Sequence, residues 1–167
     1  MHGLNDYLVN PLKEGLNDPN PYVRKTAVLC VPKVFEITPE LVIENGLIEE
    51  LNKIKDNDMN SMVFANTVQA LQELSIISGK KYFTVDKITL DKILVSINEC
   101  FEWGQVFLLD ILCEYKAENN REAEYIIDRI LPRLSHVNPA IVFTAIKCTV
   151  IHMMDLDKEL VNLLVKK

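Results

Sequence analysis

Apolar and polar positions follow a helical period along this chain, and the helices recur in pairs about every forty residues. The first helix of each pair closes just before a polar turn, at Leu16, Ile54, Ile97 and Leu134. These positions are 38, 43 and 37 residues apart (54 − 16, 97 − 54 and 134 − 97). The apolar stripes of the second helices end at Val31, Leu71, Leu112 and Val150. Each unit therefore consists of two amphipathic helices with a short polar turn between them.

A helix pair of this kind cannot bury its apolar face alone, so neighbouring pairs must stack. Self-similarity at this period is typical of helix-pair solenoids of the HEAT and armadillo type. The sequence predicts an all-α superhelix of about four helix-pair repeats, with residues 1–167 as a single α-solenoid segment. Because stacked repeats present long surfaces to partners, the pattern indicates a scaffold.

Several residues predict where individual helices begin and end. Pro21 suits the first position of a helix that Pro32 should kink or end early. Thr89 is predicted to cap a helix over 90–101. Residues 119–122 resemble a capping box, in which Glu122 reaches back to the cap.

The first helix carries leucines at every fourth position, from Leu4 to Leu16, and the last apolar stretch runs from Leu156. Both terminal stretches are apolar, so we expect the isolated chain to self-associate through its open ends.

Composition narrows the classes of function. The net charge of −6 argues against a nucleic-acid groove, which needs clustered Lys and Arg. The four cysteines form no CxxC pair, and each sits in an apolar helical stretch, so we expect buried, reduced thiols: Cys30, Cys100, Cys113 and Cys148. We expect no secretory leader, and we expect no membrane-spanning helix because no apolar run is long enough to span a bilayer. Any membrane association is therefore expected to be peripheral.

The candidate catalytic and ligand-binding motifs are weak. The stretch from Ser78 to Lys81 lacks the upstream glycine of a phosphate loop, so it is interpreted as a surface loop. The histidines, His2, His136 and His152, have no Cys or carboxylate at metal-ligand spacing. No nucleophile motif places Ser, His and acid residues together. We predict no catalytic, cofactor-binding or metal-ligating residue, no cofactor and no enzyme activity.

Other positions suggest interactions. The loop residues Lys80, Lys81, Tyr82, Phe83 and Lys87 could touch a partner or a membrane surface, although a solvated loop explains them equally. Residues 159–164 fit an acidic dileucine signal, but their leucines also fit a helix core. Arg24 is expected to reach Asp18 in the preceding turn, and Trp103 is expected to pack between adjacent repeats.

Four stretches together resemble one family: DPNPYVRKTA from Asp18, residues 51–71, INECFEWGQVFLLDIL from Ile97, and residues 121–147. The chain resembles the trunk of a beta-adaptin, the beta large chain of the clathrin-associated heterotetrameric adaptor complexes. The resemblance covers nearly the whole chain and is most specific at residues 102–105. The chain departs from the family at Pro32 and in the shorter, more basic loop 78–89.

This resemblance implies a scaffold subunit, part of a longer trunk, that acts in vesicle-mediated protein transport, cargo sorting and endocytosis. Its implied partners are the medium and small chains, the partner large chain, an Arf-family GTPase, and clathrin through regions outside this chain. The implied location is cytoplasmic, peripheral on Golgi or endosome membranes or on plasma-membrane coated pits. Two alternatives remain open: another helical-repeat scaffold, such as a coatomer large chain or a transport receptor, and a HEAT-like nucleic-acid repair enzyme.

Overall fold

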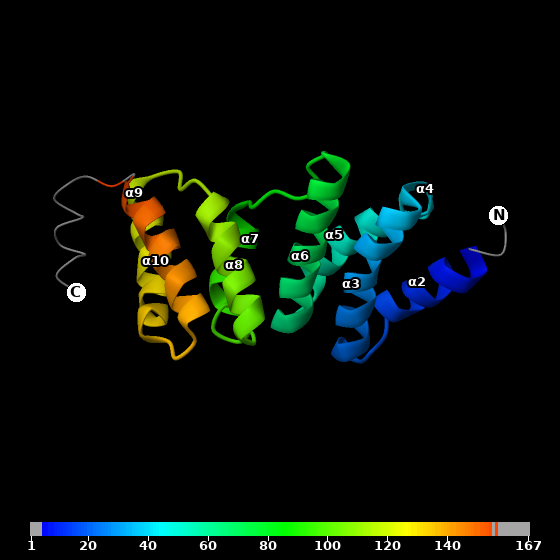
Figure 1. Ribbon diagram of the computed structural model, residues 1–167, viewed down its shortest axis with the longest axis horizontal. Coiled ribbons are helices and arrows are strands. Elements are labelled where there is room, and N and C mark those ends of the chain that lie inside the picture. The colour runs from blue at the N-terminus through cyan, green and yellow to red at the C-terminus, as the bar shows by residue number, and fades with distance from the viewer. Residues whose placement is uncertain (1–4, 155, 157–167) are drawn as a thin grey trace. The chain divides into compact units, whose positions relative to one another are not determined.

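The computed structural model of the chain describes residues 5–154 and 156, and the elements in these residues are all helical (Figure 1). In the N-terminal half they are η1 (Asn5–Val9), α2 (Asn10–Leu16), α3 (Pro21–Ile37), α4 (Pro39–Glu44), α5 (Leu47–Asn57) and α6 (Ser61–Ser78). In the C-terminal half they are α7 (Lys87–Ser96), α8 (Glu102–Glu114), α9 (Asn120–Ile130), η2 (Leu131–Ser135) and α10 (Pro139–Met154). The all-α prediction is confirmed, with helix pairs α2/α3, α5/α6, α7/α8 and α9/α10 in chain order.

The chain divides into two compact units, Met1–Leu90 and Asp91–Lys167. In the first unit α3 packs against both α2 and α6, and α5 packs against α6. In the second unit α10 packs against α8, α9 and η2. In each unit, therefore, the second helices of successive pairs lie side by side, α3 with α6 and α8 with α10 (Figure 1).

Each unit has an apolar core supplied by both helices of its pairs. Fully buried side chains of the first unit include Val28, Val31, Leu51, Val63, Phe64 and Leu71. Those of the second unit include Leu108, Leu109, Leu112, Ile126, Ile127 and Ile141. Removing such side chains from water supplies most of the stabilisation of a helix pair, because an isolated short helix is marginal in water.

Pro32 does not end its helix. α3 continues to Ile37, five residues beyond Pro32, and the proline ring is buried in the first unit. Of the two predicted outcomes, a kink or an early end of the helix, the early end is wrong. The buried Val28 and Val31 pack this part of α3 against its neighbours, and this packing outweighs the local preference at the proline. The prediction that α3 begins at Pro21 is confirmed.

The helix predicted to follow Thr89 begins earlier and ends earlier. α7 starts at Lys87, because the Asp86 carboxylate accepts a hydrogen bond from the backbone N–H of Thr89 at 2.8 Å. Thr89 itself is buried within the helix rather than capping it. α7 ends at Ser96, and residues 97–100 form a turn.

The capping box ahead of α9 forms with a shift of one residue. Asn119 Oδ1 accepts from the Glu122 backbone N–H at 3.0 Å, as the sequence predicts. The Glu122 carboxylate reaches the backbone N–H of Glu118 at 2.8 Å instead of that of Asn119. The predictions for Leu4, for the helix from Leu156 and for the dileucine stretch 159–164 lie on or reach into residues outside the described ones.

Candidate functional site

The turns between paired helices use one local motif. In residues 18–20 and 58–60, the carboxylate of the first residue accepts a hydrogen bond from the backbone N–H two residues on. The distances are 2.7 Å from Asp18 Oδ1 to Asn20 N and 2.9 Å from Asp58 Oδ1 to Asn60 N. The asparagine side chain then caps the following helix, with Asn20 accepting from Tyr22 N at 2.9 Å. The motif fixes where α3 and α6 begin.

The turn before α10 has the same shape with a different first residue. His136 Nδ1 accepts from the backbone N–H of Asn138 at 3.0 Å, in place of the aspartate oxygen. Asn138 Oδ1 accepts from Ala140 N at 2.9 Å. His136 therefore has a structural role in this turn.

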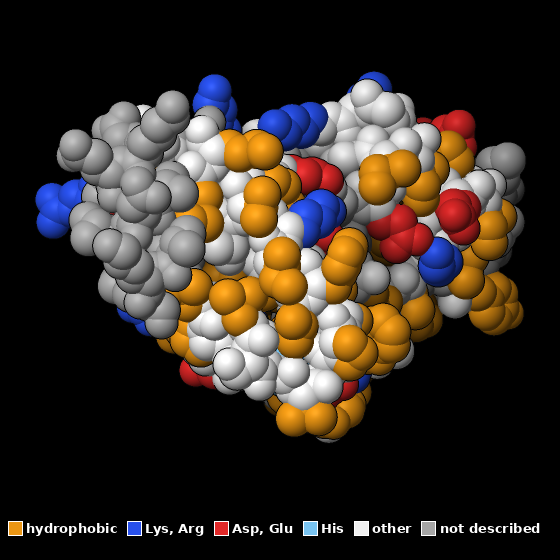
Figure 2. Space-filling model, turned by 60° about the vertical axis from the view of Figure 1, so that its left-hand side comes forward, with side chains coloured by type: hydrophobic (Ala, Val, Ile, Leu, Met, Phe, Trp, Pro, Cys, Tyr) orange, Lys and Arg blue, Asp and Glu red, His pale blue; other side chains and the backbone are white. Residues whose placement is uncertain are grey.

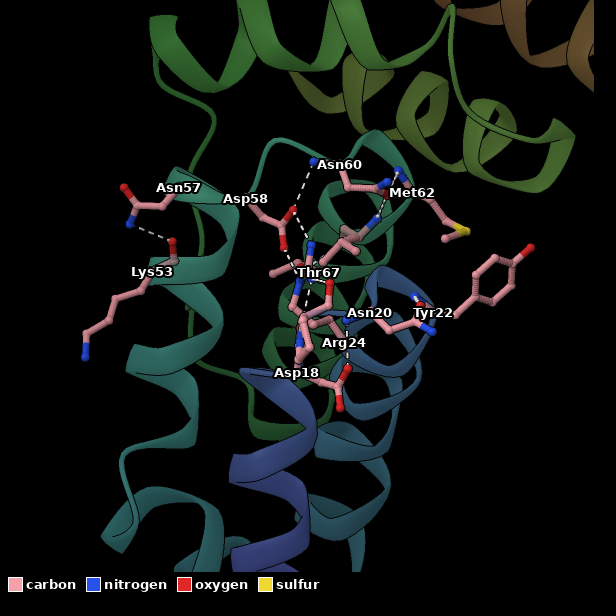
Figure 3. Close-up of polar contacts among 12 residues, drawn as sticks. Asp18, Asn20, Tyr22, Arg24, Lys53, Asn57, Asp58, Asn60, Met62 and Thr67 are labelled. Atoms are coloured by element: carbon pink, nitrogen blue, oxygen red, sulfur yellow. Dashed lines mark hydrogen bonds and ion pairs between the residues drawn. The ribbon is translucent and has the colours of Figure 1, made fainter.

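Arg24 joins two successive turns of the first unit (Figure 3). Its guanidinium meets Asp58 in a bidentate pair, with Nε to Oδ2 at 2.7 Å and Nη2 to Oδ1 at 3.1 Å. Nη1 also donates to the backbone carbonyls of Asp18 at 2.9 Å and Pro19 at 3.0 Å. The prediction that Arg24 contacts the turn of residue 18 is right, but the acid that it pairs with is Asp58.

This pair lies mostly out of solvent. The side chains of Arg24 and Asp58 are 19% and 9% exposed. The hydrogen bond to Asp58 raises the pKa of the Arg24 guanidinium, and the negative charges of Asp58 and Asp18 add to this effect. Planar two-point pairing of this kind fixes orientation as well as distance, so the two turns are held in one register.

Ion pairs between the second helices show the same register. Lys33 Nζ lies 2.6 Å from Glu73 Oε1, and both residues come 13 positions after the caps of their helices, Asn20 and Asn60 (33 − 20 and 73 − 60). In the second unit Lys147 Nζ lies 3.1 Å from Asp110 Oδ1. Successive pairs within each unit are therefore stacked with equivalent positions facing each other.

Two further contacts tie the second unit together. Nε2 of the buried His152 lies 3.0 Å from the backbone carbonyl of Leu112, which links α10 to α8. Arg133 donates to the Ile97 carbonyl at 3.2 Å and to Asn98 Oδ1 at 2.6 Å. His152 is thus a core histidine with a hydrogen-bonding partner.

Trp103 does not pack between repeats. Its side chain is 85% exposed, so the prediction of burial is wrong. The reason is its place on α8: the buried Leu112 comes nine residues later, and nine residues at 3.6 per turn are two and a half turns, which puts the two side chains on opposite faces.

Other apolar side chains near the turns of the second unit are also exposed. Phe101, Val137 and Phe143 are 71%, 96% and 71% exposed. The turns that carry Phe101 and Val137 are neighbours, because Asn138 donates to Glu102 Oε2 at 2.6 Å. In the space-filling view, hydrophobic side chains gather over the lower part of the surface shown, with few charged ones among them (Figure 2). Aromatic side chains in such a position are typical of protein–protein contacts.

The loop after α6 is not a phosphate site. Gly79 ends α6 in the left-handed conformation, with φ of 67°, so the stretch from Ser78 to Lys81 lies at the C-terminus of a helix. A phosphate loop needs the amides of a helix N-terminus instead. The interpretation of this stretch as a surface loop is confirmed.

The two aromatic residues of the same loop pack against the first unit, Phe83 more deeply than Tyr82. Phe83 is buried, with the Lys55 ammonium 6.0 Å from its ring centre, and Tyr82 stacks edge-on against Phe35 at 6.5 Å. The hypothesis that these aromatics form a binding patch with Lys80, Lys81 and Lys87 is therefore wrong for Phe83, which the first unit buries, whereas Tyr82 is half-buried.

The cysteines are all reduced, but they are not all buried. Cys100 and Cys148 are buried, Cys113 is half-buried and Cys30 is exposed. Over residues 5–154 and 156, no group of three or more His, Cys, Asp or Glu side chains gathers in a way that could hold a metal ion. His2 lies outside these residues. Across the same residues, no helix is both long and apolar enough to cross a membrane.

Comparison with known proteins identifies the family. Residues 1–151 match the model of the Cnd1 family, described as non-SMC mitotic condensation complex subunit 1. The AP-1 complex subunit beta of Dictyostelium discoideum is 41% identical over 168 residues, which cover 100% of this chain and 18% of that protein. The chain belongs to the Cnd1 family and to the beta-adaptins. The resemblance seen in the sequence and the HEAT-like fold are thereby confirmed.

Further beta-adaptins match along nearly the same length. AP-1 complex subunit beta-1 of Mus musculus is 40% identical over 158 residues, covering 94% of this chain and 17% of that protein. The corresponding subunit of Saccharomyces cerevisiae is 38% identical over 167 residues, covering 97% and 22%. The chain thus spans about a fifth of the length of the curated relatives that it matches. These relatives are named as subunits of a complex and not as enzymes.

Proposed function

We propose that this chain is a non-catalytic structural segment of the beta large chain of a clathrin-associated adaptor complex. It acts by protein–protein binding in vesicle-mediated intracellular transport, cargo sorting and endocytosis. The observation that carries the proposal is the 38–41% identity to AP-1 beta subunits along nearly the whole chain. The same relatives favour this function over that of a coatomer large chain or a transport receptor.

The fold supports a scaffold role in physical terms. Pairing of Arg24 with Asp58 and of Lys147 with Asp110 keeps successive helix pairs in register within each unit. When each helix pair is fixed in one register on the next, the outer side chains keep the same spacing. A multi-subunit assembly requires such a constant surface. The exposed aromatics Phe101 and Trp103 lie on such an outer edge.

The proposed partners are the other chains of an adaptor complex: the medium chain, the small chain and the second large chain. Clathrin binding belongs to regions outside this chain, and an Arf-family GTPase is a further proposed partner. The proposed location is the cytoplasm, with peripheral attachment through the complex to Golgi, endosome or plasma-membrane coats. We also propose that residues 1–167 act as one solenoid segment of a longer trunk.

A chimera tests the assembly function. The stretch of the Saccharomyces cerevisiae beta-1 subunit that matches this chain is replaced by the 167 residues, and the other AP-1 subunits are copurified from yeast. We expect the chimera to recover them at close to wild-type yield. A control chimera carries a stretch of equal length from a condensation complex subunit 1. Loss of the AP-1 subunits from the first chimera, with normal expression, would overturn the proposal.

The description of the matching family names a mitotic condensation complex, and the same experiment addresses that alternative. Recovery of condensation subunits in place of adaptor subunits would favour it. The net charge of −6 argues against direct binding of this segment to the phosphates of a nucleic acid.

Self-association of the isolated chain has support in the first unit. An apolar groove of about 690 Å³ runs between α2 and α3, and its lining includes Tyr7, Leu12, Val23 and Ile37. Tyr7 and Ile37 are 83% and 81% exposed. Light scattering over a range of concentrations tests this proposal, and a monomer at every concentration would contradict it.

A further inference from the structure

The turn between α4 and α5 contains an Asn–Gly sequence, which occurs once in this chain, at Asn45 and Gly46. In such a sequence the backbone nitrogen of the glycine can attack the side-chain carbonyl of the asparagine, because glycine has no Cβ to hinder the approach. This attack releases the side-chain nitrogen as ammonia and leads to deamidation. The sequence therefore supplies a reactive pair, and the conformation of the turn decides whether the two groups can meet.

Both reacting groups are engaged in hydrogen bonds. Asn45 is half-buried; its Nδ2 donates to the backbone carbonyl of Leu41 at 2.8 Å, and its Oδ1 accepts from Lys13 Nζ at 3.5 Å. The backbone N–H of Gly46 donates to the carbonyl of Ile43 at 3.1 Å. The amide that would leave and the nitrogen that would attack are thus held by different partners.

The backbone angles keep the two groups apart. Asn45 has ψ of 3°, so the nitrogen of Gly46 eclipses the backbone nitrogen of Asn45 instead of lying beside its Cβ. A ring between the two residues forms only after rotation about the Cα–C bond of Asn45, and that rotation moves the Gly46 N–H away from Ile43. The turn resists this rotation because the fully buried Val42 and Leu47 anchor it on both sides. Attack therefore requires local opening of the turn.

We propose that Asn45 is a deamidation site whose reactivity is controlled by this turn: the closed turn protects the amide, and opening exposes it to attack. In the first step the Gly46 nitrogen loses its proton to water and bonds to Cγ of Asn45. The Cγ–Nδ2 bond breaks, and the side-chain nitrogen takes up a proton and leaves as ammonia. In the second step water adds to either carbonyl of the resulting succinimide ring and opens it, which leaves an aspartate or a β-linked isoaspartate. Overall, the amide and a water molecule become a carboxylate and an ammonium ion, with no change of oxidation state.

The modified turn does not regain its original contacts. A carboxylate has no N–H to donate, so the hydrogen bond to the Leu41 carbonyl is lost. The isoaspartate product also adds a methylene to the backbone, which changes the spacing between the Gly46 N–H and the Ile43 carbonyl. The new carboxylate can pair with Lys13, but an exposed pair of this kind contributes little. Deamidation of Asn45 is therefore a one-way change that should lower the urea midpoint of the first unit.

The test compares the rate of deamidation in the folded 167-residue chain, in the same chain unfolded in urea, and in a synthetic peptide of residues 41–50. Samples are incubated at one mildly alkaline pH, and the products at residue 45 are identified by mass spectrometry. The peptide, measured with and without urea, corrects for any effect of urea on the chemistry. We expect the unfolded chain to react at the rate of the peptide and the folded chain at least about tenfold more slowly. Equal rates in the folded and unfolded chains would overturn the proposal, as would an unfolded chain that keeps Asn45 intact.

Matched variants test the role of the turn. Leu47→Ala removes a buried side chain that anchors the turn, so it should raise the rate at Asn45 in the folded chain. Leu109→Ala is the control, because it removes the same side chain from the second unit and should leave that rate unchanged. Circular dichroism confirms that both variants are folded before incubation. The same rate at Asn45 in the two variants would show that the closed turn does not control the reaction.

A further variant tests the chemistry without any demand on folding. Gly46→Ala, measured in urea, should react more slowly than the parent chain in urea, because the added Cβ hinders the attacking nitrogen. An unchanged rate would contradict attack by the backbone nitrogen of residue 46.

Discussion

The guanidinium of Arg24 and the carboxylate of Asp58, 34 positions apart in sequence, form a bidentate pair at 2.7 and 3.1 Å. Asp58 also accepts the backbone N–H of Asn60, and Arg24 also donates to the carbonyls of Asp18 and Pro19. One side chain therefore connects the turn that starts α3 with the turn that starts α6.

Removal of Arg24 should destabilise the first unit. We expect Arg24→Ala to cost about 2 kcal/mol in free energy of unfolding, because it leaves Asp58 and two carbonyls of the preceding turn without their charged donor. Urea unfolding measures this cost. Arg24→Lys is the matched control: it keeps the charge but loses the planar fork, and it should recover less than half of the loss.

A double-mutant cycle shows whether the pair itself is responsible. Asp58→Asn, combined with Arg24→Ala, should cost clearly less than the sum of the two single changes. Strict additivity would mean that the two residues contribute independently of each other.

Replacement of Trp103 should hardly affect stability. The side chain is 85% exposed, so Trp103→Ala should change the free energy of unfolding by less than about 0.5 kcal/mol. Leu109→Ala, on the buried face of the same helix, is the control and should cost about 2–5 kcal/mol. If Trp103 serves as a binding residue, its replacement should lower the yield of copurified adaptor subunits in the chimera without a change in the unfolding midpoint.

Tyr115 should ionise late in an alkaline titration. Burial, with the hydrogen bond to Glu122 at 3.1 Å and the negative charge of that residue, raises the pKa of Tyr115 to about 12. The folded pKa lies above the ordinary value of 10.0, so this stabilisation is complete below about pH 10 and is lost as the pH rises toward 12. The difference in absorbance at alkaline pH between the parent chain and Tyr115→Phe measures the ionisation directly. A transition near pH 10 in that difference would show that the phenol is solvated.

Gly46 should resist substitution more than other turn residues. It precedes α5 with φ of 67°, a left-handed conformation that costs a residue with a side chain roughly 1 kcal/mol. Gly46→Ala should therefore lower the free energy of unfolding by about 1 kcal/mol, and Gly46→Asn by less, since asparagine tolerates this region. Equal stability of Gly46→Ala and the parent chain in urea melts would refute this account.

The local signals were sufficient for the starts of most helices. Asn20, Asn60 and Asn138 stand at the turns that the apolar period predicts, and each side chain caps a helix that begins within the next residue. The capping box at Asn119 was also visible, because its donors and acceptors lie within a few residues of each other. These features depend on short-range hydrogen bonds that a sequence pattern contains almost completely.

Two of the wrong predictions concern long-range contacts. Arg24 has an acid nearby in sequence at Asp18, but the pairing partner belongs to the next helix pair. Phe83 lies in a loop that the sequence predicts to be exposed, but the first unit buries its side chain. The exposure of Trp103 could have been predicted from its position on the helix. It lies nine residues before the buried Leu112, and this separation places the two side chains on opposite faces of α8.

The sequence by itself determined the helix pairs and their period, because apolar periodicity and short-range capping are properties of neighbouring residues. The family followed from the resemblance of four stretches of the sequence to the beta-adaptins. Only the tertiary structure decided which acid Arg24 meets and that α3 runs through Pro32. These depend on the register with which one helix pair stacks on the next, and that register is set by packing and charge across about forty residues of chain.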